Sequence, residues 1–254
     1  MTTSSKSRVL LLIDLLGVKA RWHAGGRKAA EQAFGTFEQL MRDALDDDLA
    51  DKVAAGLIEA DSAAFVCSSL RCAVSIGRRV FVNTFLDPQK PTDERLWLRG
   101  VIVPFKGAAN FRRSKSLSRG HTKVNITKLH GSLLDAVAAE KSGYRGMRLL
   151  VGGGEGAGDG YRRRAATVEV KEKHYPPFLR VRTPPYPEQL RKGNFYDFLW
   201  MATSDVDEAK KLSAAMQNRI KWAANDAEEF LHAASTQVIF NHWHAFTASL
   251  PDGQ

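Results

Sequence analysis

Short apolar runs of strand length alternate with longer segments of helical periodicity between residues 8 and 151. The run Val9–Ile13 is the first of these, and the segment after it repeats apolar residues at helical spacing from Ala30 to Leu45. In chain order the segments are β-α-β-β-α-β-α-β. This order predicts an α/β fold, an α+β sandwich in which helices flank a mixed sheet.

The remaining sequence predicts two further parts. Prolines recur between residues 176 and 193, which is typical of an extended connector. Apolar residues at helical spacing then predict a helical C-terminal extension over 194–250, which packs on the sheet domain or on a partner chain. The chain is therefore divided into a sheet domain at 8–175, a connector at 176–193 and this extension.

The charge of the chain points to an anionic partner, because the formal net charge is +9 at pH 7. Between Arg95 and Leu134 there is no acidic residue. This segment is either a solvated basic face or a cradle for phosphates, and composition leaves both open. Its basic residues are Arg95, Arg99, Lys106, Arg112, Arg113, Lys115, Arg119, Lys123 and Lys128.

Several features place the chain in the cytoplasm. The two cysteines, Cys67 and Cys72, are too few for a disulfide framework and wrongly spaced for a zinc site. No apolar run is long enough to cross a membrane, and the first residues lack the pattern of a secretory signal. We therefore expect a cytoplasmic protein with no membrane partner.

Two aspartates are the candidates for chemistry. Asp14 follows a buried strand, where a carboxylate is costly unless a positive charge pairs with it, and Asp61 lies in the bend of "GLIEADSAAFV". If their strands are neighbours, both carboxylates reach one edge of the sheet. Such a pair can hold two divalent cations, Mg²⁺ or Mn²⁺, for attack on a phosphate. The alternative is two unrelated carboxylates, one capping a helix and one in a turn.

Four short motifs together resemble the class III nucleotidyl cyclases. "LLIDLLGVKA" is similar to the first-strand motif of that family, and "GLIEADSAAFV" to its metal-binding hairpin. "LRGVIVPFKGA" resembles the next strand with its glycine-containing loop, and "GSLLDAVAAEKSGYRGMRLLV" the helix and strand after it. The motifs occur in family order and cover residues 8 to 151.

The resemblance implies roles for individual residues. Asp14 and Asp61 would be the catalytic pair and would bind two Mn²⁺ or Mg²⁺ ions per site, with the Leu15 carbonyl as a further ligand. The ribose 3′-hydroxyl would attack the α-phosphate of a nucleoside triphosphate and release pyrophosphate. Residues 8–175 would be the catalytic domain, with two sites at the interface of a homodimer. Triphosphate contacts would come from Leu16, Gly17 and Val18, and base contacts from Leu57 and Glu59.

Departures from the family pattern narrow the substrate. Leu57 stands where purine cyclases carry a base-selecting Lys, and Leu134 and Ala138 stand where they carry an Asn and an Arg. The chain instead resembles the pyrimidine cyclases of bacterial anti-phage defence, the Pycsar cyclases. That resemblance implies conversion of UTP to cyclic UMP, which activates a separate effector. The missing cationic contacts to the triphosphate would come from Arg99, Lys106, Arg112 and Arg113.

Three alternatives remain at this point. The first is a cytidylate cyclase that makes cyclic CMP from CTP, and the second is a non-catalytic nucleotide-binding sensor. The third is a nucleic-acid-binding protein that uses the segment from Arg95 to Lys128. Only three aromatic residues, Trp97, Phe105 and Phe111, are interleaved with that basic segment, which disfavours nucleic acid as the partner.

Overall fold

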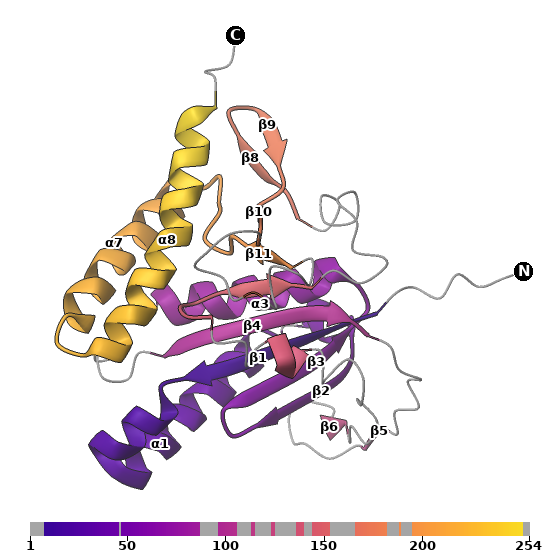
Figure 1. Ribbon diagram of the computed structural model, residues 1–254. Coiled ribbons are helices and arrows are strands. Elements are labelled where there is room, and N and C mark those ends of the chain that lie inside the picture. Colours follow the sequence, from indigo (N-terminus) through magenta and orange to yellow (C-terminus); the bar gives the residue numbers. More distant parts are fainter. Residues whose placement is uncertain are drawn as a thin grey trace, which may run out of the picture.

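The structure is a computed structural model, and it describes residues 8–45, 47–86, 96–105, 113–114, 123–124, 136–139, 144–152, 166–181, 188 and 195–250. Its centre is a seven-stranded sheet in the order β10-β11-β7-β4-β1-β3-β2 (Figure 1). The pair β4–β7 is parallel and the other neighbours are antiparallel. The expected α/β fold with a mixed sheet is therefore confirmed. The sheet strands are β1 (Val9–Leu16), β2 (Val53–Glu59), β3 (Ser62–Cys67), β4 (Trp97–Pro104), β7 (Leu149–Val151), β10 (Phe178–Arg180) and β11 (Tyr196–Phe198).

Two small two-stranded sheets and a set of helices complete the described chain. The small sheets pair β5 (Arg113–Ser114) with β6 (Lys123–Val124), and β8 (Val168–Val170) with β9 (Lys173–Tyr175). The helices are α1 (Val18–Asp43), α2 (Asp47–Ala50), α3 (Leu70–Leu86), α7 (Val206–Ala223) and α8 (Ala227–Ser249), and residues 136–139 are also helical. Among the described residues, no helix is long and apolar enough to span a membrane.

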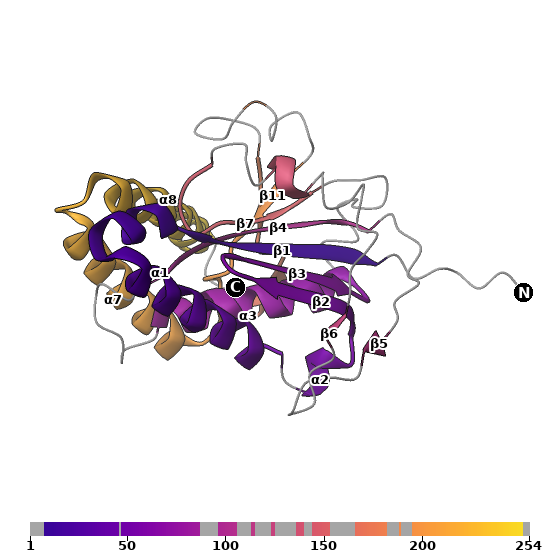
Figure 2. The same ribbon diagram turned by 90° about the horizontal axis from the view of Figure 1, so that it is seen from below.

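Strand β1 lies in the interior of the sheet, between β4 and β3, and its side chains are apolar on both faces. Leu11 and Ile13 are fully buried in one cluster with residues of α1, α3, α7 and α8, whereas Leu10 belongs to a second cluster on the other face. Figure 2 shows α1, α3 and α7 on one side of the sheet. Asp14 is the one residue of this strand that is only partly buried, and β1 continues beyond it through Leu15 and Leu16, which are buried again.

The C-terminal region is part of the same fold. β10 comes from the range expected as a connector and β11 from the range expected as a helical extension, and the two strands pair with each other next to β7. Phe81, Phe85 and Phe240 surround the buried Trp200, which brings α8 against α3. The three-part division of the chain stays a prediction, although the sheet crosses both of its boundaries.

Helix α8 is fastened to the turn before β7. The Gly146 N–H donates to His232 Nδ1 at 3.2 Å, and the Met147 N–H donates to Thr236 Oγ1 at 2.8 Å. Gly146 has a φ of 83°, and a Cβ there would lie 2.8 Å from the Thr236 nitrogen. Only glycine combines this backbone conformation with so close an approach of the helix. The turn and α8 are consequently placed as one unit beside the end of β1.

Candidate active site

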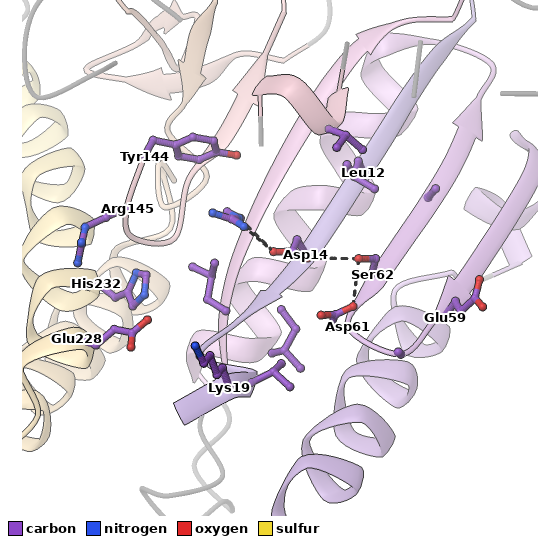
Figure 3. Close-up of a pocket in the computed structure, with 18 of the residues that line it drawn as sticks. Leu12, Asp14, Lys19, Glu59, Asp61, Ser62, Tyr144, Arg145, Glu228 and His232 are labelled. Carbon is purple, nitrogen blue, oxygen red and sulfur yellow. Dashed lines mark hydrogen bonds and ion pairs between the residues drawn. The ribbon is translucent and has the colours of Figure 1, made fainter. Parts of the chain in front are cut away.

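A pocket of about 1280 Å³ lies where β1, the β2–β3 hairpin and the start of α8 meet (Figure 3). Its wall includes most of the residues expected at the site. These are Asp14, Leu15, Leu16, Gly17, Val18, Leu57, Glu59, Asp61 and Arg99. The structure thus brings together residues that are far apart in the sequence. Asp14 and Arg99, for example, are separated by 85 positions.

Asp14 is held between two neighbouring strands by the register of the sheet. It lies opposite Ser62 of β3 and opposite Arg99 of β4. Ser62 Oγ lies 3.2 Å from Asp14 Oδ1 and 3.4 Å from Asp61 Oδ1, so its one proton can be donated to either carboxylate. Asp61 follows the tight bend at Ala60, which has a φ of 49°. The hairpin therefore places the second carboxylate beside the first.

The charge of Asp14 is only partly compensated. Burial raises the pKa of this carboxyl and the nearby Asp61 raises it further, whereas Arg99 and Ser62 act in the opposite direction. Arg99 forms an ion pair with Asp14, with its Nη2 3.0 Å from Oδ2, and the two side chains are 20% and 16% exposed. A cation bound beside both carboxylates would offset the repulsion between them and the free-energy cost of burying their charge.

The turn from β1 into α1 offers backbone donors to an anion. Gly17 precedes the helix with a φ of 76°, and no side chain among the described residues caps the helix start. The first turn of α1 carries no acidic residue, and Lys19 lines the pocket. The Leu15 N–H donates to the carbonyl of Asp61 at 2.7 Å, which fixes the hairpin to the end of β1. Free N–H groups at such a helix start favour phosphate oxygens.

The residues present fit a divalent cation that shares its ligands with a substrate. Within the described part of the chain, no group of three or more His, Cys, Asp and Glu side chains could hold a metal. Mg²⁺ commonly uses one or two carboxylates and takes its other ligands from phosphates and water. Asp14 and Asp61 match that requirement, and a role for the Leu15 carbonyl stays a prediction.

The other expected residues divide into two groups. Leu57 and Glu59 lie on β2 and line the pocket, and their role as base contacts stays a prediction. Lys106 and Arg112 lie outside the described residues, and Arg113 is described only by its backbone in β5. Of the cationic side chains expected at the triphosphate, only Arg99 is therefore located, and it faces Asp14.

Sequence reasoning missed one side of the pocket. Tyr144, Arg145, Glu228 and His232 line it, together with Lys19 (Figure 3). The Tyr144 hydroxyl donates to the Gly100 carbonyl at 3.2 Å, and burial raises its pKa. The only signal in the sequence is the four-residue spacing of Glu228 and His232, which places them on one face of a helix. That spacing does not say which part of the sheet the face meets.

His232 is buried and its ring is neutral. The exposed fraction of this residue is 7%, and the ring stacks on Trp97 with centroids 6.1 Å apart. Burial, with the nearby positive charges of Arg145 and Arg99, lowers the pKa of His232 to about 4. An imidazole that accepts the Gly146 N–H at Nδ1 cannot carry a proton there, which agrees with a neutral ring.

We predict that His232 makes the folded protein sensitive to acid. Its pKa is lower in the folded chain, so between pH 6.5 and about 4 the unfolded chain binds more protons. The stabilisation is complete above pH 6.5 and is lost as the pH falls through this window. Between pH 7 and 4.5, the unfolding free energy should fall about 2–3 kcal/mol more in the wild type than in His232→Asn. Urea unfolding at both pH values measures this, and equal falls would contradict it.

Comparisons with known proteins give a likeness of fold. No protein-family model and no curated protein match this sequence. The chain is similar to two structures of adenylate cyclases from Trypanosoma brucei in their monomeric state. One has a TM-score of 0.45 and 13% identity, covering 79% of this chain and 92% of that one. The other has a TM-score of 0.44 and 12% sequence identity, and the match covers 78% of this chain and 89% of the other.

Proposed function

We propose that this protein is a metal-dependent nucleotidyl cyclase that converts UTP to cyclic UMP and pyrophosphate. The observation that carries the proposal is the pair Asp14 and Asp61, both within hydrogen-bond distance of Ser62 Oγ and placed next to the open helix start at Gly17. Carboxylates for divalent cations thus lie beside backbone donors for phosphates. This is the combination that transfer of a nucleotidyl group requires.

Each part of the pocket has a role in the proposed reaction. Asp14 and Asp61 would hold two Mg²⁺ or Mn²⁺ ions, which would polarise the phosphate oxygens and lower the pKa of the ribose hydroxyl. The N–H groups after Leu15 bind the triphosphate. The bond between O3′ and the α-phosphorus forms while the bond from that phosphorus to the pyrophosphate oxygen breaks. The hydroxyl proton passes to water, and pyrophosphate leaves.

The choice of a pyrimidine base rests on β2. Leu57 presents an apolar side chain to the pocket where purine cyclases of the resembled family carry a Lys. Glu59 adds a carboxylate, which accepts an N–H from either uracil or cytosine. UTP is the proposed substrate, and CTP with cyclic CMP as product is the alternative within the same activity.

The assembly and the biological role belong to the same proposal. The resemblance to the Pycsar cyclases supports a homodimer with two sites at its interface. It also supports signalling in anti-phage defence through a separate effector that the cyclic nucleotide activates. In this scheme the cyclic nucleotide is the signalling molecule, so signalling depends on the release of cyclic UMP from the site.

A nucleotide-binding sensor without catalysis is the second candidate. The ion pair between Arg99 and Asp14 favours it, because the guanidinium gives the buried carboxylate a cation of its own. A cation fixed in this way competes with a metal for the same oxygens. In a sensor, nucleotides would bind in the pocket and leave it unchanged.

The test is incubation of the purified protein with ATP, GTP, CTP or UTP and Mn²⁺. Products are resolved by liquid chromatography and mass spectrometry, with Asp14→Asn as the inactive variant and the exposed Asp51→Asn as matched control. Cyclic UMP from the wild type and from Asp51→Asn alone supports the proposal. Cyclic CMP selects the alternative base. Nucleotide binding without any cyclic product selects the sensor, and product from Asp14→Asn contradicts the assigned site.

A further inference from the structure

Helix α8 brings a histidine into the pocket from the C-terminal part of the same chain. His232 lines the pocket although its exposed fraction is only 7%. A buried imidazole has two ring nitrogens that need partners. Nδ1 is satisfied by the Gly146 N–H at 3.2 Å, and none of the described residues makes a hydrogen bond to Nε2. The proton of the neutral ring must therefore be on Nε2, where it forms a donor.

The direction of this ring is fixed from several sides. Trp97 stacks on it with an interplanar angle of 28°. The Arg219 guanidinium lies 4.8 Å from the Trp97 ring centroid and itself donates to the Leu96 carbonyl at 3.0 Å. The backbone of α8 is fastened to the same turn through Thr236. A donor held this rigidly loses little conformational freedom when it binds a ligand.

Charges in the pocket are separated into two ends. Asp14, Asp61 and Glu59 belong to the end formed by the sheet, where Arg99 pairs with Asp14. His232 lies with Arg145 at the end formed by α8 (Figure 3). Arg145 is exposed, and no described carboxylate pairs with it. Glu228 also lines this end, so with Arg145 and Lys19 the local formal charge is about +1. A ligand that reaches from the metal-binding carboxylates to α8 would meet N–H donors there.

We infer that α8 forms part of the substrate site of its own chain, and that His232 is a positioning residue whose Nε2–H donates to a phosphate oxygen of the bound nucleotide beside Arg145. Among the groups of a nucleotide, the phosphates present acceptor oxygens in all directions. A hydrogen bond from an N–H group to a charged oxygen is also stronger than one to a neutral acceptor. The identity of the nucleotide rests on the proposed function. The donor itself depends only on the ring, its partners and the pocket.

Two substitutions distinguish a role of His232 in ligand binding from a role in holding the fold together. In His232→Asn the side-chain oxygen can take the place of Nδ1 and accept the Gly146 N–H, but the donor at Nε2 is lost. In His232→Gln the amide N–H can reach the place of Nε2, but the acceptor for Gly146 is lost. His242→Asn is the matched control, because His242 is exposed on the same helix.

The experiment measures the affinity of inorganic tripolyphosphate by calorimetry in metal-free buffer, with the thermal midpoint of every variant. We expect His232→Asn to keep its midpoint and to bind roughly 10- to 100-fold more weakly. His232→Gln should melt earlier and bind within a few fold of the wild type, and His242→Asn should change neither quantity. Wild-type affinity in His232→Asn, weak binding only in variants that also melt early, or no binding by the wild type would overturn the inference.

Activity assays keep this inference distinct from the proposed function. If the wild type forms a cyclic nucleotide, His232→Asn should raise KM for the triphosphate by a similar factor with little change in kcat. Tripolyphosphate binding that depends on His232, without cyclic product from any nucleotide, would support the inference while the cyclase proposal fails. Cyclic product from the wild type, with unchanged tripolyphosphate binding in His232→Asn, would support the cyclase proposal while the inference about His232 fails.

Discussion

Asp14→Asn and Asp61→Asn are each expected to lower the proposed cyclase activity at least about 10³-fold. Each substitution removes a charged oxygen ligand from the proposed cation site, and loss of that electrostatic stabilisation costs several kcal/mol in the transition state. Ser62 and Arg99 bond to different oxygens of Asp14. Asparagine keeps one oxygen that can accept from Arg99, and its amide N–H can donate to the Ser62 hydroxyl. The fold should therefore persist in Asp14→Asn, with a thermal midpoint close to that of the wild type.

The measurement is the initial rate of cyclic product formation with Mn²⁺, together with thermal unfolding of each variant. Asp51→Asn controls for the loss of a carboxylate at an exposed position outside the pocket. A variant that loses activity and its thermal transition together would show that the aspartate is structural. Activity within tenfold of the wild type in either pocket variant would remove that residue from the cation site.

Asp197→Ala is expected to lower the free energy of unfolding by about 3–5 kcal/mol. Arg148 Nη1 and Asp197 Oδ2 lie 2.6 Å apart, and their side chains are 2% and 0% exposed. The same guanidinium donates from Nη2 to the Ser235 carbonyl of α8 at 2.6 Å. Removing the carboxylate leaves a buried cation without this partner, at the point where β11, the turn before β7 and α8 meet.

Urea unfolding followed by circular dichroism measures the change, and the thermal midpoint should fall by roughly 10 °C. Replacing both partners, as in Arg148→Met with Asp197→Leu, should recover most of the loss, because neither buried charge remains. A loss below about 1 kcal/mol in Asp197→Ala would contradict the prediction. Equal losses in the single and double variants would show that packing, and not the charge, is responsible.

The first part of the fold could be predicted because its signals are local. The alternation of apolar runs and helical segments predicted β1, α1, β2, β3, α3, β4 and β7, but not the short elements α2, β5 and β6. The bend at Glu59–Asp61 was predicted from the residues around it. Strand and helix periodicities arise from residues that are close in the chain. The strands β10 and β11 were not predicted as part of the sheet, since each is short and its pairing is decided by distant partners.

The candidate site shows the same division. The sequence alone predicted Asp14, at the end of a strand, and Asp61, in a hairpin bend, as the candidate pair, because a polar residue after an apolar run is a local pattern. Only the tertiary structure decided that Arg99 is the ion-pair partner of Asp14 and that His232 enters the pocket from α8. Sheet register and helix docking bring together residues separated by many positions, and they depend on packing over the whole core. No pattern within one segment records that packing.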